Sequence, residues 1–168
     1  VDDPFIIDKN VTVRGANGSK GVPQVRAAGI ALGANVTFEN IQLEFINTWH
    51  SAIFANGYHL TLNNVTKNVG SRLIHLFAGG LYAAGGRIVV PPSGGDGRIT
   101  ITGIGEFGNL YGGSMNGPYA GNATITVRGK AVKVGDVHSC GALEAQFNRN
   151  DLFSQIEPPA PAQNATAF

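Results

Sequence analysis

The chain has 168 residues, of which 24 are Gly, with a hydrophobic fraction of 43% and a charged fraction of only 14%. This length suffices for one domain with a sizeable core, and the hydrophobic fraction excludes a wholly disordered chain. The net charge of +1, without a basic cluster, argues against a nucleic-acid partner. No run of 18 apolar residues occurs, which argues against membrane insertion.

From the N-terminus, the first expected strand is the apolar run at residues 5–7. Five copies of one phrase follow, each reading apolar, Thr, apolar, any residue, then Gly or Asn. The copies occupy residues 11–15, 36–40, 60–64, 99–103 and 125–129, so their starts are 25, 24, 39 and 26 residues apart. Self-similarity at such a period predicts stacked repeats.

Each phrase has the chemistry of a short strand that ends in a bend. The two apolar residues share one face of the strand and the Thr points to the other. The closing Gly or Asn tolerates a left-handed backbone, which predicts a sharp corner. A second apolar series follows the phrases, at Ile30, Ile53, Ile74, Leu110 and Val137. Two series with similar spacing predict a chain that winds into a coil around a core.

The remaining segments are predicted from composition. The long interval between the third and fourth phrases indicates a projecting insertion over residues 81–97, where Gly-Gly and Pro-Pro pairs occur. Residues 142–156 are the candidate C-terminal cap, because the last coil of a solenoid needs cover. Residues 157–168 are predicted to be a Pro/Ala-rich linker or tail. We therefore expect one domain over residues 1–156, a monomeric part of a larger chain.

The phrase Asn-Val-Thr-Phe-Glu-Asn-Ile at residues 35–41 resembles coils of the right-handed parallel β-helix, the pectin-lyase-like family. The string Gly-Asn-Leu-Tyr-Gly-Gly at residues 108–113 is similar to repeats in large surface proteins of Gram-positive bacteria. The resemblance covers roughly residues 5–141. It implies an all-β, single-domain right-handed parallel β-helix of about five to seven coils. It also implies a secreted or cell-surface bacterial protein.

The sequence offers little for catalysis. Polysaccharide lyases of the resembled fold need acidic residues gathered for calcium, and hydrolases need paired carboxylates. The acidic residues here are scattered among the coils, and Glu39 is expected to form a surface ion pair with Arg14 on the neighbouring coil. The lone Cys140, which follows His138, is interpreted as a small core residue rather than a nucleophile. We predict no catalytic residue, no metal and no cofactor.

Binding is the stronger hypothesis. The residue after each position of the second apolar series is expected to face outward, which gives the column Ala31, Phe54, His75, Tyr111 and His138. Flat rings at the strand spacing form a strip suited to sugar rings or a flat protein surface. The predicted ligand-binding residues are Phe54, His75, Tyr111, His138, Trp49 and Tyr82. The alternative is that the rings stack on one another and stiffen the sheet, and a register error of one residue would bury them.

The Thr column of the five phrases resembles an ice-binding face, but one interrupted column is better explained by the β-propensity of Thr. The favoured hypothesis is a non-catalytic extracellular module that presents a ligand-binding or spacer face, with a host-surface or cell-wall glycan as ligand. Two alternatives stay open. One is a carbohydrate-active enzyme, a polysaccharide lyase or glycosidase, and the other is a purely structural stalk.

Overall fold

A computed structural model describes residues 4–15, 24–25, 29–45, 51–82, 95–142 and 165–167. All regular secondary structure in these residues is β-strand, as the sequence predicts. The predicted insertion over 81–97 and the predicted cap over 142–156 fall mostly on residues 83–94 and 143–156, which lie outside the described residues. The proposed domain boundaries therefore remain predictions.

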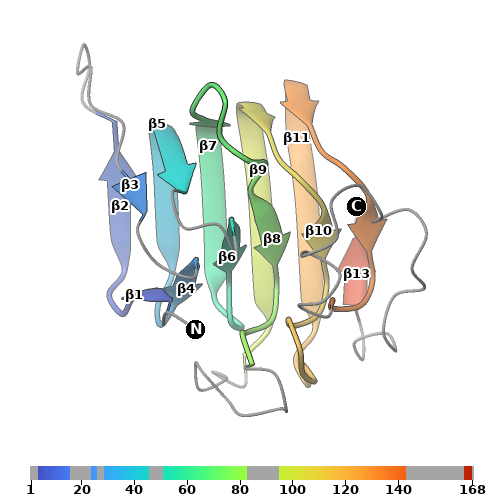
Figure 1. The fold of residues 1–168 in the computed structure, drawn as a ribbon. Helices are drawn as coiled ribbons and strands as arrows, with labels where there is room; N and C mark the ends of the chain where they lie inside the picture. The colour runs from blue at the N-terminus through green and yellow to red at the C-terminus, as the bar shows by residue number, and fades with distance from the viewer. Residues whose placement is uncertain are drawn as a thin grey trace.

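The strands alternate between two parallel sheets that face each other (Figure 1). The six-stranded sheet consists, in order, of β1 (Phe5–Ile7), β4 (Ile30–Leu32), β6 (Ala52–Phe54), β8 (His75–Phe77), β10 (Leu110–Tyr111) and β12 (Val137–His138). The seven-stranded sheet consists of β2 (Val11–Arg14), β5 (Val36–Phe45), β7 (His59–Lys67), β9 (Gly97–Glu106), β11 (Ala123–Lys133) and β13 (Ala165–Ala167), with β3 (Gln24–Val25) paired to the end of β5. A chain that visits two parallel sheets in turn is a parallel β-solenoid.

The five phrases stack in register, which confirms the first of the two predicted series. Their Thr residues pair in sequence from one strand to the next, at Thr12, Thr37, Thr61, Thr100 and Thr126. The apolar residues on either side of each Thr form two further columns. Because side chains alternate across a strand, the apolar columns point inward and the Thr column points outward.

The predicted left-handed corners occur in the middle of the stack, whereas Gly15 and Gly129, at its two ends, do not have a positive φ. Asn40, Asn64 and Gly103 have positive φ angles of 52°, 53° and 76°. The two Asn side chains also connect the rungs: Asn64 Nδ2 donates to Asn40 Oδ1 at 2.9 Å, and the backbone N–H of Ile104 donates to Asn64 Oδ1 at 3.1 Å. Asn is favoured at these corners for two reasons, since it tolerates the left-handed backbone and also satisfies polar groups of the next rung.

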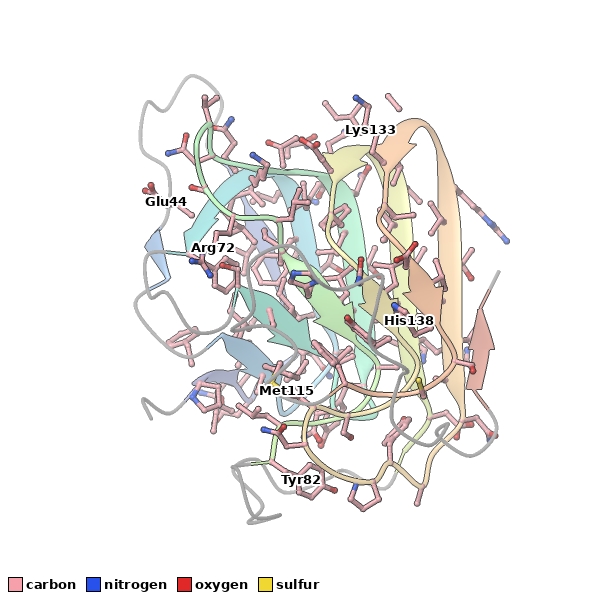
Figure 2. The ribbon with its side chains drawn as sticks, turned by 45° about the vertical axis from the view of Figure 1, so that its right-hand side comes forward. Glu44, Arg72, Tyr82, Met115, Lys133 and His138 are labelled. Carbon is pink, nitrogen blue, oxygen red and sulfur yellow. The ribbon has the colours of Figure 1, made fainter. Side chains whose placement is uncertain are left out.

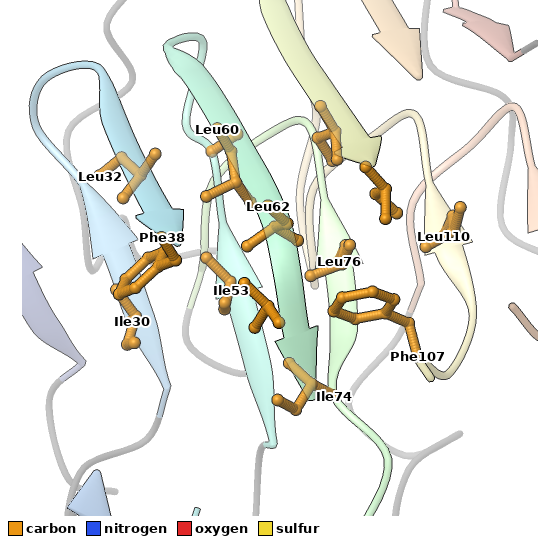
Figure 3. Packing of buried hydrophobic residues seen from close by; sticks show 14 of the residues in the cluster. Ile30, Leu32, Phe38, Ile53, Leu60, Leu62, Ile74, Leu76, Phe107 and Leu110 are labelled. Carbon is orange, nitrogen blue, oxygen red and sulfur yellow. The ribbon is translucent and has the colours of Figure 1, made fainter. Parts of the chain in front are cut away.

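The core lies between the two sheets, and Figure 3 shows its packing. Leu60 and Leu62 of the seven-stranded sheet meet Ile53, Leu76 and Leu110 of the six-stranded sheet, and all five are fully buried. Each such side chain stabilises the fold by roughly 1.5–3 kcal/mol relative to exposure. The repeated apolar columns are therefore what holds successive turns together.

The solenoid has about four turns, fewer than the predicted five to seven coils. Five stacked phrases enclose only four complete turns, because each turn needs a phrase at its start and another at its end. Two described strands follow the last phrase: β12 pairs in parallel with β10, and β13 pairs in parallel with β11 at the C-terminal end of the seven-stranded sheet.

Candidate functional site

A column of four rings crosses the outer face of the six-stranded sheet. Phe54 pairs with Phe77, Phe77 with Tyr111, and Tyr111 with His138. Three predicted ligand residues, Phe54, Tyr111 and His138, thus share one column. The placement of His75 in this column was wrong, because His75 pairs with Ala52, and Phe77 takes the expected place.

The error has a simple physical origin. Ile74 and Leu76 both point into the core and both are buried. Inward residues recur every second position along a strand, so a shift of two residues leaves the apolar pattern unchanged. The sequence pattern alone does not distinguish Ile74 from Leu76 as the partner of Ile53, and only the paired backbones identify Leu76.

The rings form a continuous stack. Their centroids are 5.0 Å apart for Phe54 and Phe77, 4.5 Å for Phe77 and Tyr111, and 4.9 Å for Tyr111 and His138. Phe54 and Phe77 are 0% exposed and Tyr111 is 3% exposed, because they belong to a second apolar cluster. The other members of that cluster are Ala31, Ala52, Leu81, Met115 and Ala142. Only the His138 end of the stack is partly exposed, so the column offers little accessible surface to a ligand. Its predicted binding role stays a prediction.

The other predicted ligand residues do not join the stack. His75 is half-buried, and its Nδ1 accepts a hydrogen bond from the backbone N–H of Asn109 at 3.0 Å. Burial lowers the pKa of His75 to about 4, so it is neutral at pH 7. Tyr82 is buried, its pKa is raised by burial, and it lies well away from His138 (Figure 2). Trp49 lies outside the described residues.

A polar network beside the stack keeps Tyr111 in place. Asn109 Nδ2 donates to the Tyr111 hydroxyl oxygen at 3.2 Å, and the backbone N–H of Asp136 donates to Asn109 Oδ1 at 3.0 Å. Burial raises the pKa of Tyr111 to about 12, with smaller raising effects from Cys140 and Asp136 opposed by the hydrogen bond from Asn109. Burial also raises the pKa of the Cys140 thiol. Both groups are thus protonated at neutral pH, and neither is prepared as a base or nucleophile.

The open face of the molecule is the outer face of the seven-stranded sheet, which we call the polar face. Its outward side chains form three columns across β2, β5, β7, β9 and β11. The central column is the Thr column. The flanking columns are Asn10, Asn35, His59, Arg98 and Thr124 on one side, and Arg14, Glu39, Asn63, Thr102 and Arg128 on the other. Nearly every outward position is therefore a hydroxyl, amide or charged group.

A shallow groove of about 360 Å³ lies over the first three rungs of this face. Its polar lining residues are Asn10, Thr12, Asn35, Thr37, His59 and Thr61. The amide side chains brace its floor, since the backbone N–H of Asn35 donates to Asn10 Oδ1 and that of His59 donates to Asn35 Oδ1, both at 2.9 Å. The groove is thus a row of hydrogen-bonding groups. It was not predicted from the sequence, because the Thr column was ascribed to β-propensity alone.

The expected ion pair is present on this face: Arg14 Nε lies 2.7 Å from Glu39 Oε2. Among the described residues, no three His, Cys, Asp or Glu side chains gather closely enough to hold a metal ion. In the same part of the chain, no helix is long and apolar enough to cross a membrane. Comparison with family models, curated proteins and solved structures finds no match for the chain.

Proposed function

We propose that this chain is a non-catalytic module of a secreted or cell-surface bacterial protein, and that it binds a glycan through the polar face. We further propose that the solenoid winds to the right, like the pectin-lyase-like β-helices that its repeats resemble. Right-handed connections between parallel strands are the strong steric preference of L-amino acids. The observation that carries the proposal is the groove floored by rungs of Thr and Asn side chains.

Glycans suit such a surface because sugars are dense in hydroxyl groups. A Thr hydroxyl both donates and accepts hydrogen bonds, and an Asn amide does the same through two different atoms. Rungs repeat every ~4.8 Å along the stack, so neighbouring hydroxyls of a chain-like ligand meet equivalent partners on successive strands. Each such contact is weak, and affinity then depends on how many rungs one ligand spans.

The chemistry of the described residues supports binding over catalysis. The carboxylate of Glu39, on the third column of the polar face, is held by Arg14, whereas glycoside hydrolysis needs two carboxylates that flank the scissile bond. The buried Tyr111 and Cys140 remain protonated, and the half-buried His75 already accepts a hydrogen bond at Nδ1.

One observation favours a second candidate, a structural stalk. The closed stack of Phe54, Phe77 and Tyr111 adds rigidity without offering a surface. A stalk would need stiffness and no ligand, and the two candidates therefore differ in whether the polar face binds anything.

A glycan array followed by titration calorimetry separates the candidates. Thr37→Val together with Thr61→Val removes two groove hydroxyls but keeps the branched shape. We expect this double variant to weaken glycan binding at least tenfold, while Thr66→Val, which lies beyond the corner on β7, leaves binding unchanged. Absence of any glycan signal would favour the stalk, and release of sugar from a polysaccharide panel would favour the enzyme.

A further inference from the structure

The polar face ends in a small patch that carries positive charge. It consists of the outward residues of β9 and β11, the last two phrase-bearing strands. Arg98 pairs with Thr124, Thr100 with Thr126, and Thr102 with Arg128. Each arginine thus has a threonine opposite it on the adjacent strand and another two residues away on its own strand. We call these six residues the Arg–Thr patch.

The register sets the dimensions of the patch. Paired residues lie ~4.8 Å apart across the strands, and four residues along a strand span ~13 Å. Arg98 and Arg128 stand at diagonally opposite corners, so their backbones are about 14 Å apart. Both side chains are exposed.

Within the described residues, neither arginine forms an ion pair. The ion pair of the polar face, Arg14 with Glu39, lies at the other end of the stack. The nearest acid along the chain is Asp96, but its Oδ1 accepts hydrogen bonds from the backbone N–H and the Nδ2 of Asn122, at 3.0 and 3.1 Å. This carboxylate is therefore hydrogen-bonded to the next rung and forms no ion pair with Arg98.

Resting on the glycan-binding function proposed above, we infer that the Arg–Thr patch binds sulfate groups of a sulfated glycan. A sulfate ester presents three terminal oxygens and one negative charge. At the Arg98 corner, the guanidinium donates two parallel hydrogen bonds, and the hydroxyls of Thr100 and Thr124 lie beside it to supply the third. A carboxylate has only two oxygens, so when both accept from the guanidinium, a threonine hydroxyl has to share one of them.

The two corners are not equivalent. The hydroxyl of Thr102 already donates a hydrogen bond to Asn63 Oδ1 at 3.2 Å. Beside Arg128, the hydroxyl of Thr126 is therefore the one left to donate to a sulfate. The Arg98 corner is therefore the primary sulfate site and the Arg128 corner the secondary one. Because the corners are about 14 Å apart, one sulfated sugar reaches a single corner, and a chain with several sulfates reaches both and gains affinity by linkage.

The test uses a chondroitin sulfate octasaccharide, its chemically desulfated counterpart, and an oligogalacturonate of similar length. We expect the octasaccharide to bind at least tenfold more tightly than the other two, and its binding to weaken as sodium chloride rises from 50 to 200 mM. Arg98→Gln should reduce binding at least tenfold, and Arg128→Gln by a smaller factor. Arg14→Gln removes the same charge from the same face, four rungs away from Arg128 in the same column, and should change binding less than twofold. Thermal unfolding of each variant verifies that the fold is kept.

The outcomes separate this inference from the proposed function. Equal binding of the sulfated and desulfated chains, lost in the Thr37→Val/Thr61→Val variant but not in Arg98→Gln, would overturn the sulfate site and leave glycan binding standing. Equal binding of the sulfated chain and the oligogalacturonate would overturn the preference for sulfate. Failure of every glycan to bind would overturn both proposals.

Discussion

Phe77 occupies the centre of the ring stack, and its replacement tests whether that stack stabilises the solenoid. The ring contacts Phe54 on one side and Tyr111 on the other, and it is fully buried. Phe77→Ala should lower the free energy of unfolding by about 3–5 kcal/mol, through lost burial and the cavity left behind. That is a large part of the 5–15 kcal/mol typical of a domain.

A second substitution separates stacking from burial. Phe77→Leu keeps most of the apolar volume but loses two ring contacts, each worth about 0.5–1.5 kcal/mol. Loss of both contacts should therefore lower the free energy of unfolding by about 1–3 kcal/mol. Phe5→Leu is the matched control, because Phe5 is 58% exposed on the edge strand β1, and its effect should stay under about 0.5 kcal/mol.

Urea unfolding followed by circular dichroism measures these differences as shifts of the transition midpoint. A double-mutant cycle with Tyr111→Leu should give a coupling energy of about 0.5–1.5 kcal/mol between the two rings. A Phe77→Leu variant as stable as the unmodified chain, with no coupling to Tyr111, would refute the claim that the stack is a stabilising element.

Four further predictions concern the corner, the buried titratable groups and the surface. Asn64→Gly keeps the positive φ but loses the corner hydrogen bonds, and should cost about 1 kcal/mol, whereas Asn64→Ala also strains the backbone and should cost about 2 kcal/mol or more in urea unfolding. The pKa of His75 is about 4 in the folded state, against an ordinary value of 6.5. Between pH 6.5 and 4 only the unfolded state takes up the proton, so the free energy of unfolding should fall by up to about 3 kcal/mol as the pH drops through this range. Above pH 6.5 the contribution of His75 should not change. Cys140 is buried with a raised thiol pKa, so a thiol reagent at pH 8 should label the native chain far more slowly than the urea-unfolded chain. Glu39→Gln breaks an exposed ion pair and should change stability by less than about 1 kcal/mol.

Each of these four predictions would be contradicted by a specific result. Equal losses for Asn64→Gly and Asn64→Ala would remove the argument from positive φ. A His75→Gln variant with the same acid profile as the unmodified chain would assign the pH dependence to other groups. Rapid labelling of native Cys140 would contradict its burial, and a loss above 2 kcal/mol for Glu39→Gln would make the ion pair more than a surface contact.

Much of the fold can be predicted from the sequence, because aligning the five phrases with one another also gives the register in which their strands pair. The phrase from Val36 to Asn40 encodes an inward pair, an outward Thr and a corner, and the structure confirms each of these. The number of turns is smaller than predicted, because five stacked phrases enclose only four turns.

The candidate site was less predictable, for two physical reasons. The side on which Phe54 and Tyr111 lie follows from strand alternation, but their burial depends on cover from residues distant in sequence, such as Leu81 and Met115. Strand alternation says nothing about what covers an outward face. The second reason is that the apolar pattern fits Ile74 and Leu76 equally well, so only the paired backbones identify Phe77 as the ring in the stack.

The polar face exists only if the five phrases stack in register on neighbouring strands. Cysteine cross-linking measures this stacking directly. In a background with Cys140→Ser, cysteines replacing Thr61 and Thr100 lie on adjacent strands in direct register, with Cα atoms ~4.8 Å apart, within the range that a disulfide spans. Cysteines replacing Thr61 and Thr126 lie two rungs apart, at ~10 Å, beyond that range. The stacked solenoid predicts rapid oxidation of the first pair in the native monomer and none of the second. Equal cross-linking of both pairs, or of neither, would contradict it.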